Sequence, residues 1–150
     1  MRHVVEVDQS IKIEQAGPSV LAFSNGIQHA VVVPSNVKRV ALRLLQAKGK
    51  PKNTAVVHLF TACLFLLLED HLLALDRIYI DTEYTGQENL IQSLLLVHIR
   101  RRVPSFASEC IVFKQIGKNS PAHAKANAVR ERKDLGYRKV KASDSLALLK

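Results

Sequence analysis

The sequence predicts a single α/β domain built on a mixed five-stranded sheet that is flanked by helices. The chain has 150 residues and 47% of them are hydrophobic, which suits one domain with one sizeable core. Up to Val33, short segments alternate apolar and polar residues as strands do. Beyond it, helical patterns alternate with two further strands, and an intervening helix favours parallel pairing with the first strand.

Three antiparallel strands are expected at the amino terminus. Residues 4–13 alternate valine and isoleucine with acidic and polar residues, the pattern of a strand with one polar face. Ala16-Gly17-Pro18 predicts a turn, residues 19–23 a second strand, Ser24-Asn25-Gly26 a hairpin turn, and residues 27–33 a third strand.

Two helices are expected next. Pro34-Ser35-Asn36 precedes a short amphipathic pattern over 37–46, and a basic break over 48–53 precedes a long apolar helix over about 54–73. The most apolar stretch, Ala55 to Leu68, is shorter than the roughly 20 residues that a membrane span needs. It therefore predicts a buried helix, and we expect no membrane partner.

The second half alternates strands with helices. The pattern predicts a strand over 77–81, a helix over 86–102 closed by Pro104, a strand over 109–115, and a helix from Ser120-Pro121 to about Lys133. Residues 1–133 are therefore expected to form the domain. Residues 134–150 are polar and basic with one late apolar patch, and we expect a basic tail that is partly disordered.

Positive charge is concentrated at the carboxyl end. The formal net charge is +9, and residues 100–150 hold 13 basic and four acidic residues, so they carry the whole excess. Such a region is typical of proteins that bind phosphate backbones, and DNA or RNA is the expected partner. A solvated basic tail without a partner is the alternative. The candidate nucleic-acid contacts are Arg100, Arg101, Arg102, Lys118, Lys125 and Arg130.

Cysteine usage and the amino terminus indicate the cellular setting. Cys63 and Cys110 are far apart in the sequence, which excludes a disulfide framework and a CxxC zinc site. Acids at Glu6 and Asp8, without a long apolar core, exclude a secretory signal peptide. We expect a cytoplasmic protein, and the sequence leaves the oligomeric state open, a homodimer included.

Two acids hold informative places in the predicted sheet. Asp8 lies within the first strand, in Val7-Asp8-Gln9-Ser10, and Asp81 ends the fourth, in Ile80-Asp81-Thr82-Glu83-Tyr84. The simpler explanations are a solvated strand face for Asp8 and a turn cap for Asp81. The carboxyl ends of strands in α/β sheets are, however, where ligands bind.

The order of elements together with these two acids resembles the ribonuclease H-like superfamily, which includes ribonucleases H, transposases and resolvase-type nucleases. The resemblance covers residues 3–133. It implies that the first and fourth strands are neighbours and that Asp8 and Asp81 meet as metal ligands. It also implies a Mg²⁺ or Mn²⁺ ion and metal-dependent phosphodiester cleavage.

Two positions depart from the family pattern. His58 stands where the family has a glutamate on the first long helix, and Asn127 stands where it has an acid or a histidine on the last helix. Glu6, Glu83 and Glu131 are the nearest acids that could substitute, and Glu131 shares a helical face with Asn127. His123 opens that helix, where the fold has a mobile residue that helps product release. The predicted catalytic set is Asp8, Asp81, Glu83, His123 and Glu131.

Two functions follow from this pattern. The first is a metal-dependent nuclease or a transposase-derived catalytic core. The second is a non-catalytic nucleic-acid-binding protein on the same fold, which His58 and Asn127 would favour because neither is a carboxylate.

Overall fold

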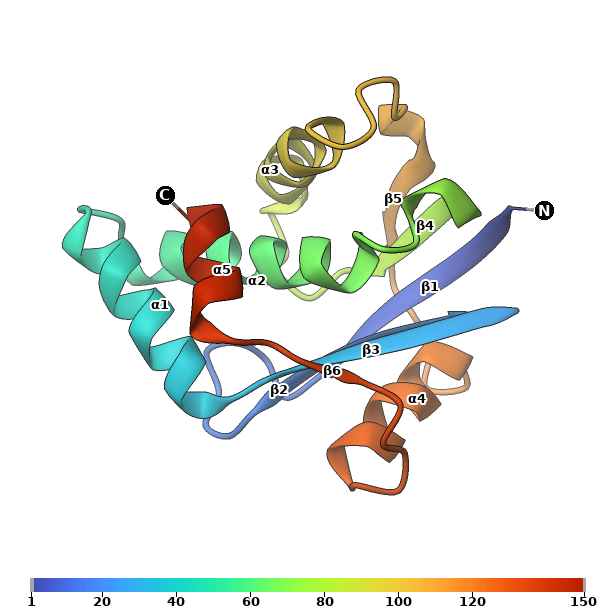
Figure 1. Cartoon of the computed structure of the whole chain (residues 1–150), viewed down its shortest axis with the longest axis horizontal. Coiled ribbons are helices and arrows are strands. Elements are labelled where there is room, and N and C mark those ends of the chain that lie inside the picture. The colour runs from blue at the N-terminus through green and yellow to red at the C-terminus, as the bar shows by residue number, and fades with distance from the viewer. Residues whose placement is uncertain (1, 150) are drawn as a thin grey trace.

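The structure is a computed structural model that describes residues 2–149. A mixed sheet has helices on both faces (Figure 1). The elements, in chain order, are β1 (His3–Ser10), β2 (Ser19–Asn25), β3 (Ile27–Val33), α1 (Ser35–Ala47), α2 (Lys52–Leu68), β4 (Leu75–Asp81), α3 (Glu88–Arg100), β5 (Ile111–Lys114), α4 (Pro121–Arg130), β6 (Arg138–Lys139) and α5 (Ala142–Leu149).

The strand order in the sheet is β5-β4-β1-β2-β3-β6. β1, β2 and β3 form an antiparallel meander, β4 pairs parallel with β1, and β5 pairs parallel with β4. The predicted mixed sheet is confirmed. The predicted strand number is wrong: six strands are present in residues 2–149, not five, because Arg138 and Lys139 pair with Val31 and Val32.

The segment after Asp134, expected as a partly disordered basic tail, forms β6 and α5 in the structure. The Val140 N–H donates to the Val32 carbonyl at 2.8 Å, and the Val140 side chain is 1% exposed. Leu149 is also buried, and α5 packs on α1 and α2. A few apolar residues in a polar segment therefore complete the core, and the late apolar patch is the one part of it that the sequence marked.

The first strand ends at Ser10, three residues earlier than the alternation predicts. Ile11 has a φ of 61°, in the left-handed region that a β-branched residue rarely adopts, so the chain turns there. Lys38 of α1 holds the following loop, because its buried Nζ donates to the Gln15 carbonyl at 2.8 Å and to Ser19 Oγ at 3.0 Å. The turn leaves Asp8 near the carboxyl end of β1.

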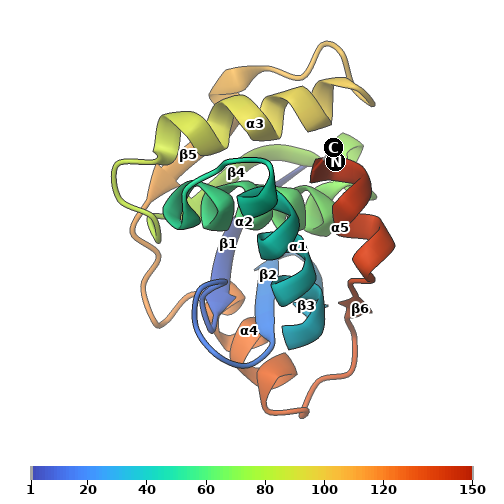
Figure 2. The same cartoon turned by 90° about the vertical axis from the view of Figure 1, so that its left-hand side faces the viewer.

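Two layers of helices cover the sheet. α1, α2, α3 and α5 lie over one face and α4 lies over the other, as Figures 1 and 2 show. Nearly all of α2 is buried, since the sheet and three helices surround it. A smaller cluster that includes Ala126 and Val129 lies between α4 and the meander. No helix within residues 2–149 has both the length and the apolar content that a membrane crossing requires.

We expect Val140→Ala to lower the free energy of unfolding by about 1–3 kcal/mol, because it leaves a cavity beside β3 in a packed core. The control is Leu135→Ala, since Leu135 is 74% exposed and its loss should change stability by less than about 0.5 kcal/mol. Urea unfolding of both variants measures the difference. Equal stabilities would show that residues 135–149 do not pack on the domain.

Candidate metal centre

The pairing of β1 with β4 places two acids side by side. Val7 pairs with Ile80 in parallel register, so the next residue of each strand, Asp8 and Asp81, lies at the same level of the sheet. Val7 and Ile80 point into the main core, and side chains alternate along a strand. Asp8 and Asp81 therefore both point toward the face that α4 covers.

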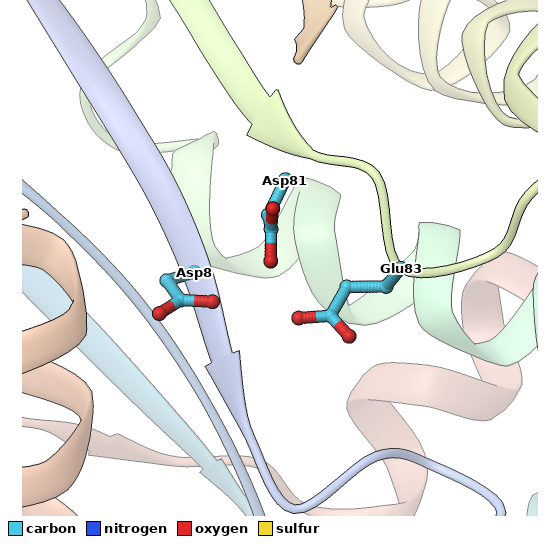
Figure 3. Close-up of side chains that lie close together, drawn as sticks. All are labelled: Asp8, Asp81 and Glu83. Carbon is cyan, nitrogen blue, oxygen red and sulfur yellow. The ribbon is translucent and has the colours of Figure 1, made fainter. Parts of the chain in front are cut away.

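A third acid joins them from the loop after β4. Asp8, Asp81 and Glu83 each present an oxygen atom, and these atoms lie within 4.8 Å of one another. Figure 3 shows the three carboxylates converging, Asp8 from β1, Asp81 from the end of β4 and Glu83 from the loop. This is the group among residues 2–149 that could hold a metal ion.

The electrostatics of this group are unfavourable without a cation. Burial raises the pKa of Asp8, whose side chain is 6% exposed, although contacts with His123 and the Gln9 N–H oppose the rise. Burial also raises the pKa of Glu83, and the neighbouring Asp81 raises it further through a hydrogen bond and charge repulsion. Three carboxylates held this close would favour either a shared proton or a bound divalent cation.

A hydrogen-bonded chain from α4 orients Asp8. His123 Nδ1 lies 2.7 Å from Asp8 Oδ2, and Asn127 Nδ2 lies 3.0 Å from His123 Nε2. Because an amide nitrogen can only donate, Nε2 accepts, and Nδ1 carries the proton that is donated to Asp8. Ser10 Oγ donates to Asn127 Oδ1 at 3.4 Å. Asn127 thus acts at this site through His123.

Further contacts hold Asp81, Glu83 and the nearby Glu6. The Ile116 N–H donates to Asp81 Oδ1 at 2.8 Å, and Lys12 Nζ lies 3.7 Å from Glu83 Oε2. Glu6 lies outside the three-acid group: it accepts from Ser120 Oγ at 2.9 Å and pairs with Lys114 at 3.4 Å. Glu6 therefore links β1 to the start of α4 and to the end of β5.

Two positions that the sequence analysis considered, Glu131 and His58, lie outside the three-acid group in the structure. Glu131 follows the end of α4, where its carboxylate pairs with Lys133 at 3.0 Å and with Arg130 at 3.7 Å. His58 lies on α2 and lines a separate pocket with Lys50. Asp8, Asp81, Glu83 and His123 are thus brought together, and Glu131 and His58 are not among them.

The predicted nucleic-acid contacts do not form one surface. Arg102 Nη2 pairs with Glu69, which precedes β4, whereas the acids lie at the opposite end of that strand. Seven residues of strand separate the two ends by about 20 Å. Arg100, Arg101 and Arg102, which close α3, therefore lie away from the acids.

The basic residues around α4 differ in their exposure and in their ion-pair partners. Lys118 is exposed in the turn that leads into the helix, two residues before Ser120. Lys125 is buried and pairs with Asp134 at 2.7 Å, so it is not free to bind a phosphate. Arg130 ends the helix beside Glu131. Lys118 is thus an exposed cation at the entrance of the helix that carries His123.

Sequence reasoning missed two residues that shape the site. Tyr84 Oη lies 3.2 Å from Glu14 and 3.4 Å from Gln9, and it accepts from the Ile13 N–H at 3.3 Å. It thereby joins the loop after β4 to the loop after β1. Lys12 approaches Glu83 from the same loop. Neither residue carries a local signal, because both contacts span about 70 positions of the chain.

Comparisons of the chain with models of known families, with curated proteins and with solved structures give no match. The ribonuclease H-like relationship therefore stays a prediction, supported by the residues of this chain alone.

We expect the metal-free protein to lose stability as the pH rises through the range in which Glu83 ionises. The pKa of Glu83 is higher in the folded protein than in the unfolded chain. The contribution of Glu83 to the free energy of unfolding is therefore full below the unfolded-state pKa, and it is lost as the pH rises through the folded-state pKa. Glu83→Gln should remove this loss, which amounts to roughly 1.4 kcal/mol per pH unit between the two pKa values.

Thermal unfolding in a chelator, between about pH 5 and pH 9, measures the effect as a difference in Tm between wild type and variant. The control is Asp76→Asn, which alters an exposed acid at the start of β4, and its Tm should change with pH as the Tm of wild type does. A Tm difference for Glu83→Gln that does not depend on pH would contradict the expectation.

Proposed function

We propose that the protein is a metal-dependent phosphodiester nuclease of ribonuclease H-like type that acts on DNA or RNA. One observation carries the proposal: Asp8 and Asp81 converge from two adjacent parallel strands and Glu83 from the loop after the second, with oxygens within 4.8 Å of one another. The strand order β4-β1-β2-β3, in which the first strand neighbours the fourth, supports the resemblance. The extra strand β6 is an addition to the pattern that the resemblance implies.

The donor set suits a hard divalent cation. Only carboxylate oxygens converge, and neither cysteine lies in the group, which favours Mg²⁺ or Mn²⁺ over zinc. Asp8, Asp81 and Glu83 would hold the ion. When bound, it would supply charge stabilisation for a phosphate and lower the pKa of a coordinated water.

The other side chains have supporting parts in this proposal. His123, held by Asn127, orients the Asp8 carboxylate and leaves its other oxygen directed at the group. Both ring nitrogens of His123 are engaged, Nδ1 with Asp8 and Nε2 with Asn127, so its part is to position the Asp8 carboxylate. The Ile116 N–H fixes Asp81, and Lys12 reduces the repulsion at Glu83.

Lys118 and Lys114 extend the site toward a phosphate backbone. Lys114 ends β5 and its Nζ lies 3.4 Å from Glu6, while Lys118 is exposed at the entrance of α4. A strand that passes over the acids would meet these cations, which favours backbone contact without base recognition.

We expect Asp81→Asn to lower the rate of metal-dependent cleavage by more than about 100-fold, because it removes a charged ligand and keeps the side-chain shape. The amide oxygen of the substituted side chain can still accept from the Ile116 N–H, so the fold should be retained. Cleavage of single-stranded DNA, RNA and RNA–DNA hybrid with Mg²⁺ or Mn²⁺ measures the effect.

Asp76→Asn is the matched control for this experiment. It makes the same chemical change on the same strand, at the exposed end away from the acids, and should cleave as wild type does. The nuclease proposal fails if Asp81→Asn and wild type cleave all substrates equally.

The second candidate, a non-catalytic nucleic-acid-binding protein, is favoured by Asn127, an amide where the resemblance implies an acid or a histidine. It predicts salt-dependent binding of the same substrates with no cleavage in either metal. Under both candidates, Lys118→Met should weaken binding severalfold at low salt and reduce the slope of log affinity against log salt by about 1. Fluorescence anisotropy across a salt series measures that slope, and an unchanged slope would exclude Lys118 as a contact.

A further inference from the structure

A pocket with a basic and apolar lining lies away from the acids, where α2, α3 and α5 meet the loop after α1. Its volume is about 350 Å³, within the range of small-molecule sites. Leu94, Val97, His98 and Arg101 follow the spacing of one face of α3, and they form one wall of the pocket. Figure 2 shows α5 beside the carboxyl-terminal part of this helix.

The lining of this pocket is positive and lacks any acid. Lys48 and Lys50 come from the loop after α1, His58 from α2, and His98 and Arg101 from α3. Lys48 Nζ donates to the Leu149 carbonyl at 3.1 Å, which holds it at the rim. For Lys50 and Arg101, the described residues contain no ion-pair partner. Two full charges are therefore available to a ligand.

Two imidazoles, His58 and His98, belong to the same lining. His98 is 9% exposed, and its Nδ1 is buried without a hydrogen-bond partner among residues 2–149. Burial, with a smaller contribution from Arg101, lowers the pKa of His98, and burial with Lys50 lowers the pKa of His58. Lys48, Lys50 and Arg101 share this pocket with both imidazoles, and His98 also borders a neighbouring pocket that Glu69, Arg102, Arg138 and Asp144 line.

The apolar part of the lining limits the kind of ligand. Leu94, Val97, Leu148 and Leu149 form the rest of the pocket, and Val97 is 52% exposed. Bare inorganic phosphate would leave these side chains in water, whereas a ligand with an apolar body would cover them. A nucleic-acid backbone likewise needs only the charges.

We propose that this pocket binds a small organic anion, a phosphate or carboxylate carried on an apolar body. Lys50 and Arg101 neutralise the anionic group, and the leucines of α5 with Val97 contact the body. The site shares no lining residue with the three acids and does not depend on nuclease activity.

Phenyl phosphate and benzoate are the probes, added to the full-length protein and followed by amide chemical shifts. Inorganic phosphate supplies the charge without the body, and phenol supplies the body without the charge. We expect saturable shifts at Lys50, Arg101 and Leu149 with one or both organic anions, at least about tenfold tighter than with inorganic phosphate or phenol. Comparing phenyl phosphate with benzoate shows which anionic group is preferred.

Lys50→Met/Arg101→Met should weaken that binding at least about tenfold. The control is Lys139→Met/Lys141→Met, which removes the same charge from exposed lysines outside the pocket and should change affinity less than about twofold. If the double variant fails to give a folded spectrum, Lys50→Met and Arg101→Met are measured singly.

Two results would overturn the proposal. One is an equal response to inorganic phosphate and to the organic anions, which would leave only a charged surface that a nucleic acid could also occupy. The other is equal weakening by the pocket variant and its control, which would show that net charge alone attracts the probes.

Discussion

The parallel pairing of β1 with β4 is the constraint on which the candidate metal centre depends. With Val7 opposite Ile80, the two aspartates that follow lie at one level, and the alternation of side chains turns both away from the core. A shift of one residue in either strand would send one acid into the apolar layer. The central position of both strands in the sheet, with β5 on one side and β2 on the other, holds that register.

The close approach of the acids opposes folding, and the surrounding residues offset only part of this effect. His123, the Ile116 N–H and Lys12 each contact one carboxylate, yet the pKa values of Asp8 and Glu83 remain raised. Packing on the other face of the sheet, where the buried helix α2 contacts α1, α3 and α5, offsets the repulsion between the acids. A core on one face and an electrostatically strained cluster on the other is an arrangement in which binding a cation would stabilise the fold.

The basic residues of the carboxyl-terminal third contact different parts of the protein. Lys125 neutralises Asp134 within the fold, Arg102 and Arg138 both contact Glu69, and Arg101 faces a pocket that is separate from the acids. A count of charges along the chain therefore overstates the surface that one polyanion could use. The charge that the sequence concentrates in residues 100–150 lies at opposite ends of β4, because β5 runs parallel to β4 between Arg102 and the basic residues around α4.

The sequence by itself determined the meander and the alternation of helices with the later strands, because periodicity and turn residues act locally, and it indicated Asp8 and Asp81 as candidate metal ligands. It did not show where β1 ends, since Ile11 keeps the apolar alternation while its backbone turns. Only the tertiary structure decided which acid completes the group, that Asn127 acts through His123, and that the last residues form β6 and α5. These outcomes depend on contacts between distant parts of the chain, whose energies no local pattern of residues encodes.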